Sequence, residues 1–503
     1  MKQILCLTMI LLIAAQIPAQ KTALSETRPL VFTGVTVIDI SGGKLKSGTT
    51  VIVSGNRITN VGKKVKIPKD AQIIDAGGKF LIPGLWDMHA HSFTDNGWEW
   101  FFPLLITNGV TGVRELGTRL PFERINQMRR ETLEGKILGP RYGAVTARVL
   151  DGTGSQILPQ TVVETPEQAR NLVREYKRQG MDFIKVYNLL SREVYLAIID
   201  EAKRQKMPVA GHVPFSMTAS EVSDLGQISI EHFTDIFLSC SRDEDALREE
   251  RRQGLAKGLT LRPASPLETR AGATYDEQKA AALATRFRRN GTWWCPTIIL
   301  SGTVPAERQR EGDSRLKYIP TPTQETWRNA VNASIRVMPN ADDRKMRYER
   351  KLEIVGLMHR AGVRLLAGTD APNPYVYPGF SLHEELELLI RAGLTPLEAL
   401  QTATINPARF LGKEDEFGTI EKGKIADLVL LEANPLEDIR NTTRIAAVVA
   451  HGKYLAKTDL QKLLSDVEAA NLRNESNKKQ SVLWNFTNRP NYKFLSDAAH
   501  ICD

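Results

Sequence analysis

Residues 80–91 read FLIPGLWDMHAH, an apolar run that ends in two histidines one residue apart, His89 and His91. In a β-strand, side chains two residues apart point to the same face, so both imidazoles can reach one cation. A strand over Leu85–His91 with polar groups at its C-terminal end is therefore predicted. In a barrel of alternating strands and helices, the catalytic groups collect at that end of the strands.

Short apolar runs rich in β-branched residues alternate with amphipathic helical stretches as far as residue 415. One helix, predicted over Pro166–Gln179, begins after a threonine N-cap and ends before a glycine. Eight such strands predict an α/β fold, a (β/α)8 TIM barrel over residues 85–415, with insertions at 240–285 and 301–345 that cover the strand ends. The predicted strands are Leu85–His91, Val110–Leu116, Arg141–Val149, Phe183–Tyr187, Pro208–Val213, Ser229–Phe233, Trp293–Leu300 and Leu365–Asp370.

Two β-rich segments flank this region. Residues 29–84 and 416–457 alternate apolar and polar residues and break at Gly, Asn and Lys turns. We expect the two segments to pair into one composite β-sandwich domain that the barrel splits in sequence. Residues 458–503, polar and helix-prone at first, form a C-terminal extension.

The first twenty residues, MKQILCLTMILLIAAQIPAQ, combine a basic Lys2, an apolar run from Ile4 to Ala15 and a small residue at Ala19. This pattern predicts a signal peptide over residues 1–19 and therefore a secreted or periplasmic protein. The alternative, an uncleaved membrane anchor, is disfavoured because the run is too short to span a bilayer. No stable membrane insertion is expected after cleavage.

The 503-residue chain carries a net charge of +9, with its basic residues spread along the sequence. A solvated basic face is favoured over a nucleic-acid site, because aromatic and basic residues are not interleaved. Three cysteines would remain after signal cleavage: Cys240, Cys295 and Cys502. They form neither a disulfide framework nor a CxxC motif, so any pairing stays open, as does the oligomeric state.

Further polar residues interrupt or end the predicted strands. The chain has eight histidines, and four of them stand at strand ends. Imidazole and carboxylate groups are the ligands that open catalytic zinc sites favour, and a metal site is therefore predicted. Any one of these residues alone would more often be structural, but packing explains the whole pattern poorly. The candidate ligands are His89, His91, Lys185, His212, His232 and Asp370.

Several motifs resemble those of the amidohydrolase superfamily. They are FLIPGLWDMHAH, NGVTGVRELGT (108–118), LLAGTDAP (365–372), the segment from 382 to 412, and GTIEKGKIADLVLL (418–431). The similarity covers nearly all of residues 30–453 and is strongest to imidazolonepropionase-like and Xaa-Pro dipeptidase-like members. The resemblance implies a metal-dependent hydrolase acting on a C–N bond of a small-molecule substrate such as a dipeptide or an N-acyl amino acid.

The resemblance also implies two divalent metal ions, zinc first, with manganese or cobalt as alternatives. His89, His91 and Asp370 would hold the more buried ion, and His212 and His232 the other. Lys185 stands where many members carry a lysine carboxylated by carbon dioxide, which would bridge the ions. If it is unmodified, one metal on His89, His91, His212 and Asp370 is the alternative.

Three residues are predicted to act in catalysis. Asp370 would take a proton from hydroxide-forming water between the metals and pass it to the leaving amine. Tyr187, two residues after Lys185, would contact the substrate or else pack at the barrel rim. Arg114 would bind a substrate carboxylate, or else pair with Glu115.

The same candidate residues are compatible with other functions. The same site would suit a hydrolase of cyclic amides, lactones or esters, or a deaminase that uses one metal and no carbamate. A different class is a binding protein that has lost activity. Such a protein would be expected to lack a metal-ligating residue, whereas all six candidate positions carry one. The hypothesis that the chain is a basic protein of the cell envelope would rest on its net charge alone.

Overall fold

The computed structural model describes residues 28–94, 96–155, 160–257, 266–300, 312–337 and 340–476. The predicted signal peptide, Cys502 and residues 477–503 lie outside the described residues. Cys240 and Cys295 are buried free cysteines. None of the described helices is both long enough and apolar enough to cross a membrane.

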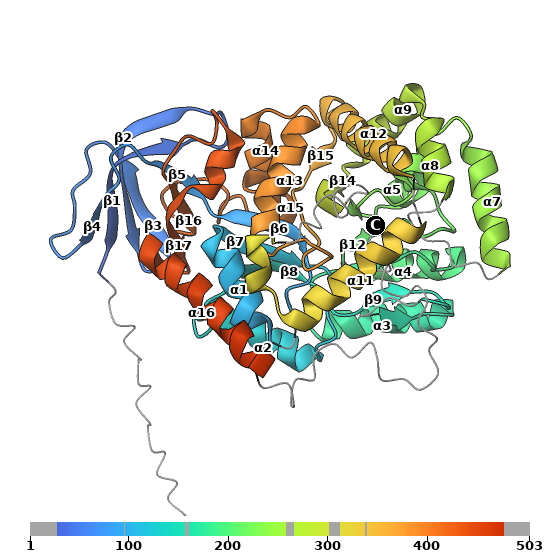
Figure 1. The fold of residues 1–503 in the computed structure, drawn as a ribbon, viewed down its shortest axis with the longest axis horizontal. Helices are drawn as coiled ribbons and strands as arrows, with labels where there is room; N and C mark the ends of the chain where they lie inside the picture. The colour runs from blue at the N-terminus through green and yellow to red at the C-terminus, as the bar shows by residue number, and fades with distance from the viewer. Residues whose placement is uncertain are drawn as a thin grey trace, which may run out of the picture.

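The two β-rich flanks form one sheet of eight strands (Figure 1). The junction is an antiparallel ladder between β5 and β16, in which Leu81 faces Leu430. Alternate side chains of β16 enter different cores: Leu430 packs with β1 and β2, and Val429 packs with the barrel helices. A separate sandwich domain stays a prediction, because these strands form one hydrogen-bonded sheet. The order is β18 (Lys453–Ala456), β17 (Ile445–Ala450), β16 (Leu428–Leu431), β5 (Phe80–Pro83), β1 (Leu30–Ile38), β2 (Leu45–Ser54) and β3 (Arg57–Gly62), with β4 (Gln72–Asp75) on β1.

The middle of the chain forms two all-parallel sheets. Seven of the eight predicted runs contain one strand, the eighth shares only Leu365 with β15, and two short strands, β9 and β10, are added. The smaller sheet is β6 (Leu85–Ala90), β7 (Val110–Glu115) and β8 (Arg141–Val145). The larger is β10 (Gln160–Val162), β9 (Val149–Asp151), β11 (Ile184–Val186), β12 (Val209–Gly211), β13 (Ser229–Glu231), β14 (Trp293–Cys295) and β15 (Arg364–Leu365).

Hydrogen bonds link the two parallel sheets at both edges. Beyond β15, the Met88 amide donates to Ala367 O (2.9 Å), and Ala90 bridges Ala371 in parallel. On the other side the Asp182 amide donates to Val145 O (2.9 Å). These parallel sheets and their helices fit a TIM-barrel-like fold. Full closure stays a prediction, because no continuous ladder joins the two sheets among the described residues.

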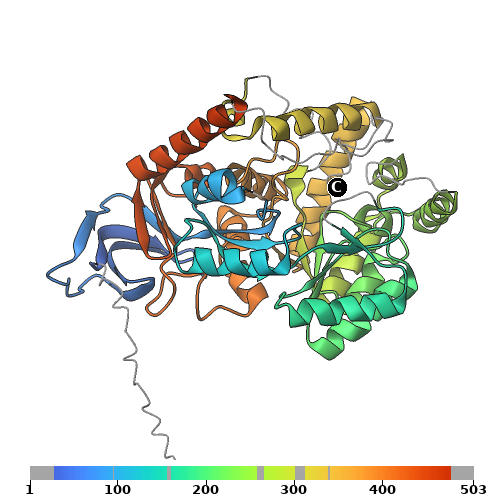
Figure 2. The same cartoon turned by 90° about the horizontal axis from the view of Figure 1, so that it is seen from below.

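Helices follow the strands and cover the sheets (Figures 1 and 2). The capping predicted from sequence is present: Thr165 and Gln168 form a capping box at the start of α3. The α-helices are α1 (Gly97–Thr107), α2 (Phe122–Leu133), α3 (Pro166–Arg178), α4 (Arg192–Gln205), α5 (Ala219–Asp224), α6 (Ile236–Ser239), α7 (Glu244–Ala256), α8 (Pro266–Ala273), α9 (Glu277–Asn290), α11 (Thr321–Val337), α12 (Ala341–Arg360), α13 (Phe380–Arg391), α14 (Pro396–Thr402), α15 (Ile405–Leu411) and α16 (Lys457–Ser476). Short 3₁₀ turns are η1 (Ile298–Leu300), η2 (Ser314–Tyr318) and η3 (Ile439–Thr443).

Two helices late in the chain, α11 and α16, pack against the parallel-sheet region. In the second predicted insertion, the Trp327 indole of α11 donates to Pro372 O (2.9 Å), which places α11 over the end of the eighth strand. In the C-terminal extension, α16 packs beside α1 (Figure 1), and Asn471 donates to Lys317 O (3.1 Å). The end of the eighth predicted strand is thus bordered by one inserted helix, α11.

Candidate metal centre

The structure brings the six predicted ligands together at the C-terminal ends of the strands. His89 lies in β6 and His91 directly follows it, whereas Lys185 lies within β11. His212 and His232 follow β12 and β13, and Asp370 stands five residues beyond β15. Five of the six side chains are buried, and His91 is 23% exposed. The exposure of His91 marks the side from which solvent reaches the group.

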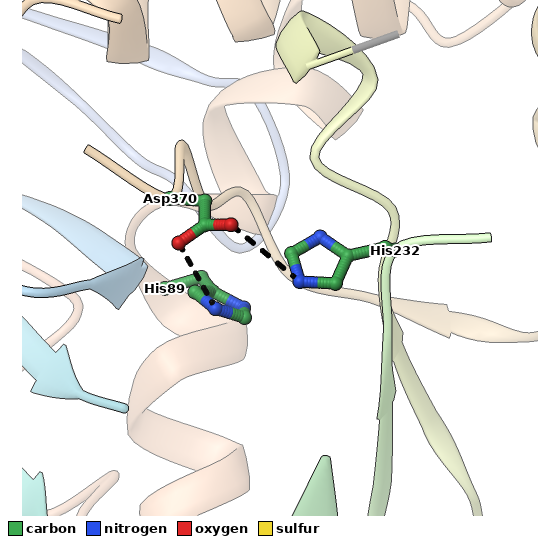
Figure 3. A group of neighbouring side chains, drawn as sticks. All are labelled: His89, His232 and Asp370. Atoms are coloured by element: carbon green, nitrogen blue, oxygen red, sulfur yellow. Dashed lines mark ion pairs between the residues drawn. The ribbon is translucent and has the colours of Figure 1, made fainter. Parts of the chain in front are cut away.

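Asp370 is the centre of the cluster (Figure 3). Its Oδ1 lies 3.1 Å from Nε2 of His91 and 3.5 Å from Nε2 of His89. Its Oδ2 lies 3.6 Å from Nε2 of His232. Ligand atoms of His89, His232 and Asp370 all lie within 4.8 Å of one another. Such spacing suits donors that converge on a cation.

Lys185 and His212 complete the group. The Lys185 Nζ lies 3.5 Å from Nε2 of His89. The His212 ring stands edge-on to the His232 ring, with 4.8 Å between centroids. All six predicted ligands therefore meet in one place.

Each histidine uses its Nδ1 to bond an oxygen outside the cluster. These partners orient the rings so that every Nε2 faces the interior of the cluster. This arrangement is typical of metal-bound histidine. The Thr297 hydroxyl donates its own proton to Pro296 O and so accepts from His232. The pairs are His89 with Glu231 Oε2 (2.9 Å), His91 with Gly117 O (2.8 Å), His212 with Asn188 Oδ1 (2.9 Å) and His232 with Thr297 Oγ1 (2.6 Å).

The electrostatics favour neutral imidazoles. Burial, followed by the Lys185 charge, holds the pKa values of His89 and His212 well below the ordinary histidine value. Burial lowers the pKa of His232 in the same way. A neutral imidazole has a lone pair on Nε2, which is what metal binding requires.

Four buried atoms of the cluster have no hydrogen-bond partner among the described residues. They are Nε2 of His212, Nε2 of His232 and both carboxylate oxygens of Asp370. Buried polar atoms without partners are costly and rare, and a bound divalent ion would satisfy these. The donor set, nitrogen and carboxylate oxygen around one point, therefore fits a zinc-type metal centre.

Two ligands have unusual backbone conformations. His232 and Asp370 have φ values of 58° and 60°, in the left-handed region that non-glycine residues seldom adopt. The Asp370 amide donates to His89 O (2.6 Å), which ties its strained segment to β6. Strain of this kind is found where the surrounding structure fixes a functional side chain.

Sequence reasoning missed Asp87, which supports the cluster through hydrogen bonds to the segments that carry His89 and Asp370. Its Oδ1 accepts from the amides of His89 (3.1 Å) and Thr369 (3.0 Å), and its Oδ2 accepts from the Thr369 hydroxyl (2.6 Å). Burial raises the pKa of Asp87 to about 7. Asp87 thus links the strand of His89 to the segment of Asp370. An acid inside an apolar run, two residues before a ligand, was the available signal.

The two remaining predicted residues differ in placement. The Tyr187 ring packs 3.9 Å from the His212 ring between centroids, so a contact with substrate stays a prediction. Arg114 is buried at 1% exposure, and its guanidinium bonds Met88, Ser229 and Glu231. This placement fits the structural ion pair better than a carboxylate clamp, and the partner is Glu231, not Glu115.

The sequence profile of the amidohydrolase family matches residues 80–455, which include all six predicted ligands. The chain belongs to the amidohydrolase family. The resemblance predicted from its motifs is thereby confirmed.

Known amidohydrolases are similar over different lengths. Imidazolonepropionase of Pseudomonas paraeruginosa is 25% identical over 415 residues, covering 76% of this chain and 87% of that protein. Ochratoxinase of Aspergillus niger is 40% identical over only 83 residues. That match spans 16% of this chain and 16% of the length of ochratoxinase.

Solved structures match over most of the chain. Bottromycin amidohydrolase has a TM-score of 0.67 and 26% identity, covering 89% of this chain and 91% of that one. A prolidase in complex with N-methylphosphonate-L-proline has a TM-score of 0.59 and 21% identity, covering 85% of this chain and 99% of that one. The prolidase shares the fold. The family and bottromycin amidohydrolase support a hydrolase that acts on amide bonds.

Proposed function

We propose that this amidohydrolase cleaves an amide C–N bond of a small substrate, such as a dipeptide or an N-acyl amino acid, with two divalent metal ions. One observation carries the proposal. Four histidines are held through Nδ1 by outside oxygens, and three of them turn Nε2 toward Asp370, whose buried oxygens have no hydrogen-bond partner among the described residues. Zinc is the first choice for these donors, with manganese or cobalt as alternatives.

The chain offers two groups of ligands. His89, His91 and Asp370 would hold one ion, and His212 and His232 the other. When bound, such ions polarise the substrate carbonyl and lower the pKa of a water molecule. The exposed edge of His91 is where a small substrate would enter.

Lys185 is proposed to be carboxylated. An ammonium group has no lone pair, and it would repel a cation beside the Nε2 of His89. In carboxylation the amine nitrogen bonds to the carbon of carbon dioxide and one proton is released. The resulting carbamate is an anion with two oxygens, which suits a position between two groups of neutral histidines.

Asp370 is proposed to move the proton. Its two oxygens face His89 and His91 on one side and His232 on the other. From this position the carboxylate takes a proton from the attacking water and passes it to the amine nitrogen that leaves. The hydrogen bond from its own amide to His89 O keeps the side chain in place.

The substrate class rests on several similarities. A prolidase of the same fold binds a proline phosphonate, and the chain also resembles Xaa-Pro dipeptidase-like members. A dipeptide and an N-acyl amino acid share an amide next to a free carboxylate.

The signal-peptide pattern of residues 1–19 supports export to the periplasm or medium, which sequencing of the mature N-terminus tests.

A substrate screen tests the proposal directly. Zinc-loaded protein is incubated with a library of dipeptides and N-acyl amino acids, and release of free amine is measured. We expect turnover of members of at least one of the two groups. Turnover of lactones or esters without any amide would contradict the proposed bond. Ammonia release from ring amidines with one metal bound would instead identify a deaminase.

A further inference from the structure

Glu231 lies directly behind His89, on the side away from Asp370. It precedes His232 in sequence, and strand alternation would send these neighbours to opposite faces. The left-handed backbone of His232 breaks that alternation, so both side chains reach the same site. Glu231 is fully buried, and its Oε2 accepts the Nδ1 proton of His89 (2.9 Å).

Donors from the protein saturate the Glu231 carboxylate. Nη2 of Arg114 lies 2.8 Å from each oxygen of Glu231, and the Ser229 hydroxyl donates to Oε1 (2.5 Å). Glu231 is therefore not available as a metal ligand, although it forms a compact group with His89 and Cys295. A cation placed in that group would also face the Arg114 charge.

Arg114 fixes this carboxylate relative to the backbone that carries His89. Its Nε donates to Met88 O (2.6 Å), one residue before His89, and its Nη1 donates to the Ser229 hydroxyl oxygen (2.8 Å). A planar guanidinium bonds three groups in a fixed geometry, which a flexible lysine cannot reproduce. The ion pair thus joins β6, β7 and β13 at one point beneath the metal centre.

The other three histidines have neutral hydrogen-bond partners at Nδ1, although Nδ1 of His91 also lies 4.0 Å from Oε1 of the buried Glu115. Their Nδ1 partners are a backbone carbonyl, an amide and a hydroxyl, at Gly117, Asn188 and Thr297. An anionic partner makes an imidazole a stronger donor to a metal than a neutral partner does. The two groups of ligands are therefore unequal, and the carboxylate that is hydrogen-bonded directly to an imidazole lies at His89.

We propose that Glu231 and Arg114 are a positioning pair that orients His89 and selectively raises affinity for the metal ion held with His91 and Asp370. This inference rests on the two-metal site proposed above. The pair acts through His89 and touches no substrate. Loss of an oxygen partner behind a metal-bound histidine typically costs about 10–100-fold in metal affinity.

A double-mutant cycle read out by zinc affinity tests the pair. In a His212→Ala background, which retains the His89 group, Glu231→Gln should weaken zinc binding by about 10–100-fold in a chelator competition. In a His89→Ala background the same change should leave the affinity of the remaining site unaltered. Equal losses in both backgrounds would show a merely structural role and overturn the proposal.

A second variant keeps the test possible if Glu231→Gln does not fold. One buried charge left alone destabilises a protein strongly, whereas removing both is tolerated better. The Glu231→Gln/Arg114→Met protein should therefore fold, as judged by circular dichroism, and still bind the tighter zinc about 10–100-fold more weakly. Wild-type affinity in this folded variant would refute the pair. Fewer than two zinc ions on the wild type would instead refute the two-metal site itself.

Discussion

Asp370→Asn should lower kcat/KM by about 10²–10⁴-fold, the usual contribution of a group that moves a proton in catalysis. Asparagine keeps the size of the side chain, so the buried cluster should remain packed. It lacks the negative charge and cannot accept the proton from the attacking water. The measurement is steady-state amide hydrolysis with the best substrate of the screen, at saturating zinc.

An acid far from the cluster provides the matched control. Asp224 ends α5 and bonds Arg286 and Asn290 on α9. Asp224→Asn should therefore retain wild-type kcat/KM. Equal turnover by the wild type and Asp370→Asn would eliminate the proposed role of Asp370.

Lys185→Ala should abolish tight binding of at least one metal ion and, with it, activity. The change removes the only group in the cluster that can form a bridging carbamate, and it leaves a gap between neutral histidines. A short carboxylic acid such as acetate can enter that gap and supply the missing anion. Partial return of both metal binding and activity is therefore expected on adding acetate.

Lys351 is a matched buried lysine outside the site. Its Nζ lies 4.9 Å from the centroid of the Phe233 ring. Lys351→Ala should retain the metal content of the wild type, measured after identical dialysis. Full metal occupancy in Lys185→Ala would count against the bridging role.

Much of the fold and most of the site were predictable because they depend on local patterns. The strand period places His89 and His91 on one face, and seven of the eight predicted strands contain an observed one. The end of the eighth strand was less accurate. β15 ends at Leu365, since the backbone then leaves the ladder to present Asp370 in a left-handed conformation.

The supporting residues could not be predicted, because their partners are distant in sequence. Arg114 was expected either to bind a substrate carboxylate or to pair with Glu115, but its carboxylate partner lies 117 positions along the chain. Glu231 was hidden by strand alternation, which fails at the positive φ of His232. A periodic pattern shows where a strand lies; it does not show which buried charge a side chain meets across the interior.

The most direct test of the two-metal account is the metal content of the active wild-type enzyme. The protein is stripped with a chelator, reconstituted with zinc and freed of loosely bound ions by gel filtration. Elemental analysis should then find two zinc ions per chain, with activity rising until both are bound. Full amidase activity at one zinc ion per chain would contradict the account.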